Sequence, residues 1–320
     1  MSGPLIAGLA LVVALALTPV VMVVARHLGV VDRPGALKPQ TVPVPYLGGV
    51  AVFAAVVVGA AAGRPSVLLP LGMALGLGVA DDRVDLPAPI RLIGQLAIGG
   101  AVVATCPVRL DGTIAAILIL ALTVLMINGV NLIDGLDMLA GGVVAVAAVG
   151  FAVALHGAGR QLGIALAAGL AGFLYYNRPP ARVYLGDGGS YLLGAALAVL
   201  VAEAWAPGVA APVGIAVLAL VAVPVAEVAC AMVRRFRGRR SLLAGDRRHP
   251  YDRLVARGWS APAASLTYIG CEALLTVGAL VAVHLASMTA AVVLDVAAAV
   301  LLVASGAGAG ALTPDEEATK

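Results

Sequence analysis

Apolar stretches long enough to cross a bilayer recur along the whole chain, separated by short polar or glycine-rich connections. A helix needs about 17 to 25 mainly apolar residues to span a membrane. The pattern therefore predicts an all-α, polytopic membrane bundle. The eleven expected spans are residues 4–25, 46–63, 66–80, 91–106, 113–128, 139–156, 161–177, 190–206, 212–233, 263–284 and 288–307. The third and fourth are short and glycine-rich, so a count of ten stays open.

Composition supports this interpretation. Hydrophobic residues make up 62% of the 320 residues and charged residues only 12%, far from the composition of soluble globular proteins. We expect one integral membrane domain over residues 1–320, with a large basic loop at 234–262 and a short polar tail at 308–320. The first span has no basic residues before it and no evident cleavage site, so we expect no cleaved signal peptide. The three cysteines are widely spaced and indicate neither a disulfide framework nor a metal site.

Basic residues indicate the orientation. If the loop after the first span is cytoplasmic, then of the 20 Lys and Arg residues only Arg64, Arg109 and Arg160 fall on the other side. The positive-inside rule then places the N-terminus outside. Nine arginines lie between Arg234 and Arg257. That run is a topology signal, a surface that faces the substrate, or both.

Acidic residues gather on the same expected face. Carboxylates at a membrane edge are costly, so they are candidates for function by default. The aspartates assigned to the cytoplasmic side are Asp32, Asp81, Asp82, Asp85, Asp134, Asp137, Asp187, Asp246 and Asp252. We expect several of them to converge on one site.

The stretch LGLGVADDRVDL ends an apolar run with Asp81 and Asp82. Two adjacent carboxylates repel each other unless a cation lies between them, so the pair suits a hard cation or a proton acceptor. A solvated turn is the alternative interpretation. Asp85 is interpreted as a turn residue.

The stretch NGVNLIDGLDMLAGG places a polar side chain at every third position: Asn128, Asn131, Asp134 and Asp137. In a regular helix this spacing drifts by about 60° per step, so all four cannot share one face. A tighter turn or a break near Gly129 or Gly135 would let more of them converge. Amides and carboxylates at this spacing suit a nucleoside, a hydroxyl-rich ligand or a metal.

The stretch YLGDGGSYLLGA flanks Asp187 with Gly186, Gly188 and Gly189 before a helix expected to begin near Ser190. Free N–H groups at a helix N-terminus can approach a phosphate closely. Asp187 would hold Mg²⁺ against that phosphate. A glycine-rich turn with an aspartate near the helix cap is the alternative.

The basic loop ends in GDRRHPYDR, which offers Arg247, Arg248 and His249 beside Asp246 and Asp252. These donors suit a diphosphate or anionic lipid headgroups. His249 alone would be an ordinary interfacial histidine.

Taken in order, these motifs resemble the polyprenyl-phosphate N-acetylhexosamine-1-phosphate transferase superfamily, the MraY- and WecA-like glycosyltransferase family 4, and among these the WecA type. The resemblance covers about residues 30 to 258 and rests on DRPxxxK through PYLGG, the Asp81–Asp82 pair, NxxNxxDGxD, YLGDGGS and the arginine-rich DRRH loop. Members transfer a sugar 1-phosphate from a UDP-sugar to a polyprenyl phosphate at the cytoplasmic membrane face, with Mg²⁺, and release UMP.

The resemblance implies roles for individual residues. Asp187 is the expected Mg²⁺ ligand, with Mn²⁺ as an alternative ion. Asp81 and Asp82 correspond to an adjacent-aspartate motif needed for activity. The expected catalytic set adds Asp134 and Asp137, which with Asn131 match the nucleotide and diphosphate site. The remaining expected substrate-binding residues are Lys38, Asn128, Gly186, Gly188, Arg247, Arg248 and His249.

Two departures from the family pattern stand out. Met138 replaces a second glycine after NxxNxxDGxD, and the histidine-rich signature HIHH or HHH reads His249, Pro250, Tyr251, Asp252. The triple-histidine form goes with UDP-MurNAc-pentapeptide enzymes. Its absence favours a UDP-N-acetylhexosamine, with N-acetylglucosamine first, and leaves UDP-MurNAc-pentapeptide as the alternative.

The expected function is therefore a Mg²⁺-dependent phosphoglycosyl transferase of a bacterial inner (plasma) membrane that starts a cell-wall or surface glycan. Its partners are the UDP-sugar, polyprenyl phosphate and membrane lipid; no nucleic acid is expected, and a homodimer stays open. A phosphate monoester is mostly dianionic near pH 7 and needs no strong base, which favours direct attack, although Asp82 as base or nucleophile stays open. A transporter would place its acids near the midplane, and a CDP-alcohol phosphotransferase would continue a DG pair as DGxxAR, which this chain does not.

Overall fold

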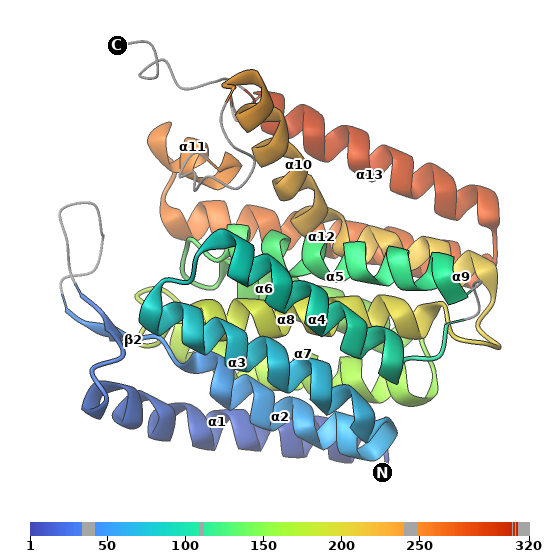
Figure 1. Cartoon of the computed structure of the whole chain (residues 1–320). Coiled ribbons are helices and arrows are strands. Elements are labelled where there is room, and N and C mark those ends of the chain that lie inside the picture. Colours follow the sequence, from blue (N-terminus) through green and yellow to red (C-terminus); the bar gives the residue numbers. More distant parts are fainter. Residues whose placement is uncertain (34–41, 109–111, 240–248, 309, 311, 313–320) are drawn as a thin grey trace.

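The computed structural model describes residues 1–33, 42–108, 112–239, 249–308, 310 and 312. It is a bundle of helices with their axes roughly aligned (Figure 1). The bounds of the elements are α1 Gly3–His27, β1 Val31–Asp32, β2 Val44–Pro45, α2 Gly48–Gly63, a 3₁₀ turn at Pro65–Val67, α3 Leu68–Val84, α4 Ala88–Thr105, α5 Gly112–Ile133, α6 Leu139–Ala154, α7 Gly157–Asn177, α8 Gly186–Ala204, α9 Ala211–Ala216, a 3₁₀ segment at Val217–Val221, α10 Ala222–Arg237, α11 Pro250–Ala256, α12 Ala261–His284 and α13 Met288–Gly308.

The predicted polytopic membrane bundle is confirmed. Each of the eleven expected spans coincides with a helix or, for 212–233, with the path α9 to α10. Within the described residues, seven of these helical segments are long and apolar enough to cross a membrane, and α2 and α6 are shorter apolar helices. The two β strands form one small antiparallel ribbon that pairs Val31 with Pro45.

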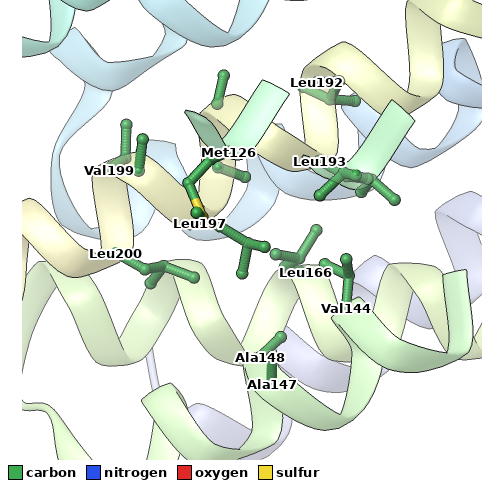
Figure 2. Close-up of a cluster of buried hydrophobic side chains, with 14 of the residues drawn as sticks. Met126, Val144, Ala147, Ala148, Leu166, Leu192, Leu193, Leu197, Val199 and Leu200 are labelled. Atoms are coloured by element: carbon green, nitrogen blue, oxygen red, sulfur yellow. The ribbon is translucent and has the colours of Figure 1, made fainter. Parts of the chain in front are cut away.

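Helix α8 forms the centre of the bundle. Every residue from Gly188 to Ala204 is buried, and α8 packs against α3 and α5, with further contacts to α2 and α7. In Figure 2, Leu193 and Leu197 of α8 lie among Met126 of α5 and Leu166 of α7. A helix that is apolar on all sides is stable only when other helices surround it, so the site at its start is held by the whole core.

Small residues let neighbouring helices approach α8 closely. A Cβ at Gly78 of α3 would overlap the backbone of Asp187, and one at Gly194 would overlap the backbone of Ile127 on α5. Small residues at helix contacts are the usual means of close packing in membranes. Gly78 thus brings the end of α3 against the start of α8.

One expected span is broken. The path 212–233 continues through α9, the 3₁₀ segment and α10 rather than as one α-helix. Pro224 lies in the first turn of α10 and has no N–H to donate to the preceding turn. The backbone therefore tightens into 3₁₀ geometry just before it.

Three helices extend past the expected ends into the polar motifs. Helix α3 continues through Asp81 and Asp82, α5 continues to Ile133, and α8 begins at Gly186 instead of near Ser190. Of the two expected places for a break, Gly129 lies inside α5, whereas the chain leaves the helix after Ile133 and turns around Gly135, as the second alternative predicted. Asp85 has a left-handed backbone with φ of 48° and ends α3, which confirms it as a turn residue.

Candidate active site

The ends of α3, α5 and α8 meet at one end of the bundle, and Asp82 joins α3 to α8. Its Oδ1 accepts a hydrogen bond from the Asp187 N–H at 2.9 Å, and its Oδ2 accepts one from the Gly188 N–H at 3.1 Å. The first N–H groups of a helix have no partner within the helix, and a carboxylate there is favoured by the helix dipole. Asp82 thus caps α8 from a neighbouring helix. The Asp187 and Gly188 N–H groups, which were expected to bind a phosphate, instead donate to Asp82.

Asp187 is fixed by Asn131 of α5. The Asn131 side-chain amide donates to Asp187 Oδ1 at 2.7 Å and contacts Ser190 Oγ at 3.1 Å. In the part of the chain that the structure describes, Asp187 Oδ2 carries no hydrogen bond. One oxygen is therefore held in place while the other remains available to a ligand.

Asp81 has a different environment from its neighbour Asp82. It is 4% exposed. Its Oδ2 accepts from the Tyr191 hydroxyl at 2.5 Å and lies 3.5 Å from Arg91, and its Oδ1 accepts from the Leu86 N–H at 2.8 Å. These internal partners give Asp81 the environment of a residue that holds α3, α4 and α8 together.

Asp134 lies just after α5 and faces the other acids. Burial raises its pKa well above the ordinary value, and the charges of Asp187 and Asp82 raise it further. Among the described residues, its side chain has no hydrogen bond or ion pair. A carboxylate in this position is stabilised by an added cation.

Asp137 lies in the same turn but points to another segment. Its Oδ2 accepts from the Ala181 N–H at 2.9 Å, and its carbonyl accepts from the Ser265 hydroxyl at 2.9 Å. Burial raises its pKa, and the Ala181 hydrogen bond opposes the rise. Asp137 therefore connects the turn after α5 to the segment before α8.

Asn128 does not join this cluster. Its amide donates to Gln95 of α4 at 2.7 Å and to the Val124 carbonyl at 2.7 Å. Asn128 and Asn131 are three residues apart on α5, but Asn128 bonds α4 and Asn131 bonds α8. Three of the four polar residues of the motif therefore bond three different segments: Asn128 bonds α4, Asn131 bonds α8, and Asp137 bonds the segment before α8.

His249 lies at the start of α11, outside the carboxylate cluster. Its Nδ1 is 2.7 Å from Glu227 Oε1, and its side chain is 6% exposed. The His249 N–H donates to Asp252 Oδ2 at 3.0 Å, which caps α11. The other expected basic residues, Lys38, Arg247 and Arg248, lie outside the described residues, as does Asp246.

With this geometry established, comparisons with known proteins place the chain. Residues 65–204 match the model of glycosyl transferase family 4. The chain is 30% identical to a probable undecaprenyl-phosphate N-acetylglucosaminyl 1-phosphate transferase of Bacillus subtilis (strain 168), covering 78% of this chain and 76% of that protein. It is 31% identical to the decaprenyl-phosphate N-acetylglucosaminephosphotransferase of Mycobacterium tuberculosis H37Rv, with 75% and 72% covered. A phospho-N-acetylmuramoyl-pentapeptide-transferase of Desulforudis audaxviator is 37% identical over 60% of this chain and 73% of its own length.

The chain belongs to glycosyl transferase family 4. The predicted family is thereby confirmed. The region matched to the family model contains α3 to α8 and so includes Asp82, Asn131, Asp134 and Asp187. The residues that the structure brings together are those of the family region.

A magnesium ion fits the donors of this family 4 site. Among the described residues, no three His, Cys, Asp or Glu side chains form a ready metal cage. Mg²⁺, however, usually takes one or two protein carboxylates and completes its shell with water and substrate phosphates. Asp187, with one oxygen held by Asn131 and one available, is suited to that role, and the charge of Asp134 favours a cation beside it.

The sequence pattern did not predict the roles of several residues at the site. Tyr191 and Arg91 both contact Asp81, and Glu227 pairs with His249. Tyr191 lies one helical turn after Asp187, which places it near the motif, but nothing in its spacing predicts Asp81 as a partner. Glu227 lies within the predicted span 212–233, and nothing in its spacing predicts His249 as a partner.

Proposed function

We propose that this protein transfers N-acetylglucosamine 1-phosphate from UDP-N-acetylglucosamine to a polyprenyl phosphate, in a Mg²⁺-dependent reaction at the cytoplasmic membrane face. The product lipid would start a cell-wall or surface glycan. One observation carries the proposal: three helix ends of the family region bring Asp82, Asn131 and Asp187 into direct hydrogen bonding at one end of a membrane bundle. The relatives from B. subtilis and M. tuberculosis, which are named as N-acetylglucosamine 1-phosphate transferases, support this choice of sugar.

The reaction requires one anion to approach another. An oxygen of the lipid phosphate bonds to the β-phosphorus of the UDP-sugar, the bond from that phosphorus to the bridging oxygen breaks, and UMP leaves. The lipid phosphate is already mostly dianionic near pH 7. Its attack therefore needs charge neutralisation and alignment more than a base.

The chain's residues divide this work. Asp187 would hold Mg²⁺, which supplies charge neutralisation for the diphosphate when bound. Asn131 orients the Asp187 carboxylate, and Asp82 fixes the start of α8 on which Asp187 lies. Both Asp82 oxygens accept backbone hydrogen bonds, which supports direct attack by the lipid phosphate over a covalent Asp82 intermediate.

Orientation is part of the proposal. The site end of the bundle is also the end at which α1 and α10 end and at which α2 and α12 begin (Figure 1). The sequence between these helix ends holds eight of the 20 Lys and Arg residues, and four more lie in the last turns of α1 and α10: Arg26, Arg234, Arg235 and Arg237. The positive-inside rule supports the cytoplasm as the side that this end faces.

Transfer by the purified protein tests the function. Protein in detergent would be mixed with undecaprenyl phosphate, Mg²⁺ and one of UDP-N-acetylglucosamine, UDP-N-acetylgalactosamine or UDP-MurNAc-pentapeptide. UMP release and labelled sugar in the organic phase would be measured, with EDTA as the control. We expect EDTA-sensitive transfer from UDP-N-acetylglucosamine. Transfer only from UDP-MurNAc-pentapeptide would replace the proposed sugar, and transfer from none would reject the function.

A further inference from the structure

Tyr251 of α11 reaches across to the end of α5. Its hydroxyl donates to the Leu132 carbonyl at 3.0 Å, and the residue is 4% exposed. Helix α5 ends at Ile133, so Leu132 is among the last carbonyls that have no N–H partner within the helix. Tyr251 therefore caps the C-terminus of α5, at the point where the turn with Asp134 and Asp137 begins.

The Tyr251 ring is held on both sides. It stacks on His249, with centroids 5.3 Å apart and planes within 10°, and it meets the edge of Tyr268 at 6.2 Å. Glu227 of α10 binds both neighbours, His249 at 2.7 Å and the Tyr268 hydroxyl at 3.3 Å. Three helices thus fix the position of one hydroxyl group.

Gly135 shows how closely Tyr251 covers the turn. A Cβ built at Gly135 would overlap the Tyr251 hydroxyl and lie 2.7 Å from its Cζ. Gly135 has no positive φ, so its backbone conformation does not require glycine. Glycine is needed here because a side chain would overlap Tyr251. The turn and the Tyr251 ring are therefore complementary surfaces.

From these contacts we propose that Tyr251 is a positioning residue, which holds the turn 134–138 so that Asp134 keeps its place beside Asp187 and Asp137 keeps its bond to the Ala181 N–H. The inference rests on the proposed function. Tyr251 is buried and its hydroxyl donates to the Leu132 carbonyl, so we assign it a role through the turn. Because the turn is expected to serve the UDP-sugar, losing the hydroxyl should affect that substrate more than the lipid.

The test compares two tyrosine hydroxyls with the same type of bond. Tyr251→Phe removes the bond to Leu132, and Tyr176→Phe removes a 3.0 Å bond from the Tyr176 hydroxyl to the Leu15 carbonyl of α1. We expect Tyr251→Phe to lower kcat/KM for UDP-N-acetylglucosamine by about 10-fold, as loss of a supporting hydrogen bond at a functional site does, with KM for undecaprenyl phosphate unchanged. Tyr176→Phe should change neither constant. Equal effects of the two variants, or a Tyr251→Phe effect confined to the lipid, would overturn the inference.

A double-mutant cycle tests the contact itself. Gly135→Ala should reduce transfer in the wild-type background, because the new methyl group displaces Tyr251. In the Tyr251→Ala background, Gly135→Ala should cost little more, since residues in contact give non-additive effects. Additive losses would show that Gly135 and Tyr251 act separately.

Hydrogen exchange keeps the inference testable even if no donor is used. The backbone amides of residues 134–138 should exchange faster in Tyr251→Phe than in wild type or Tyr176→Phe, because the turn opens more often without its anchor. Unchanged exchange in this segment would reject the positioning role. Failure of wild-type transfer with the expected exchange would instead reject the proposed function alone.

Discussion

At the Gly186 end of α8, Asp82, Asp134 and Asp187 lie within electrostatic reach of one another, whereas at the Ala204 end Glu203 forms an ion pair with Arg64 at 2.7 Å. The Glu203 side chain is 8% exposed and that of Arg64 is 33% exposed. One end of the central helix therefore neutralises its carboxylate within the chain. At the other end several carboxylates lie together, and Arg91 lies 3.5 Å from one of them, Asp81.

This difference separates a structural role for charge from a functional one. A buried carboxylate whose only role is structural is paired, because an unpaired charge in a low-dielectric interior is costly. A group of carboxylates that raise one another's pKa suits a site that gains a cation with its substrate. The two ends should therefore respond in opposite ways to mutation: activity should depend on one, and stability on the other.

The largest expected effect is that of Asp187→Asn. The amide keeps the shape of the side chain and can still bond Asn131, but it removes the charge that would bind Mg²⁺. We expect transfer to fall by about 10²–10³-fold or more, with the thermal unfolding temperature in detergent close to that of wild type. Glu203→Gln is the matched control at the other end of α8 and should retain transfer. Comparable turnover by Asp187→Asn would remove Asp187 from the metal role.

Much of the fold could be predicted from the sequence, because membrane-spanning helices are recognisable as long runs of apolar residues. The eleven expected spans all correspond to helical segments. The predicted ends of α3, α5 and α8 at the site were wrong by several residues. The apolar run ends at the first polar residue, but the helical hydrogen bonds continue past it. Asp82 and Asn131 stay helical because their side chains find partners on α8.

The partners themselves could not be predicted. Asp82 is separated from Gly188 by 106 positions, and Tyr251 from Leu132 by 119. Such pairs depend on how helices are arranged, which single-sequence patterns do not encode. His249 illustrates the result: the motif predicted a substrate ligand, and the structure adds a buried pairing with Glu227 that no spacing indicated.

A smaller effect is expected from Arg64→Met. It leaves Glu203 largely buried without its partner, which should destabilise the protein; because Arg64 is one-third exposed, we expect about 1–2 kcal/mol and not the larger cost of a fully buried pair. Thermal unfolding in detergent would measure this. Transfer at a temperature where the variant is folded should equal that of wild type.

The matched double variant Arg64→Met/Glu203→Met sharpens this result. Replacing both partners by apolar groups removes the uncompensated charge, so the lost stability should largely return. If the double variant were less stable than Arg64→Met alone, the pair would not be the cause of the loss.

The smallest expected effect is a pH-dependent stabilisation by Mg²⁺. The pKa of Asp134 is raised in the folded protein, first by burial and then by the charges of Asp187 and Asp82. Between the ordinary pKa of about 3.9 and that raised value, the folded state binds more protons than the unfolded state, so stability should fall as the pH rises. In EDTA the unfolding temperature should therefore decrease from pH 5 to pH 8. Mg²⁺ competes with these protons and should restore about 2–4 °C at pH 8 and less at pH 5.

The variant Asp134→Asn tests whether the decrease of the unfolding temperature with pH in EDTA comes from the carboxylates at the Gly186 end of α8. The variant has one titrating carboxyl fewer and less repulsion, so its unfolding temperature in EDTA should change less with pH than that of wild type. Glu203→Gln, which alters the paired end, should keep the wild-type slope. If both variants kept it, the pH dependence would arise elsewhere, and the contrast between the two ends would rest on transfer activity alone.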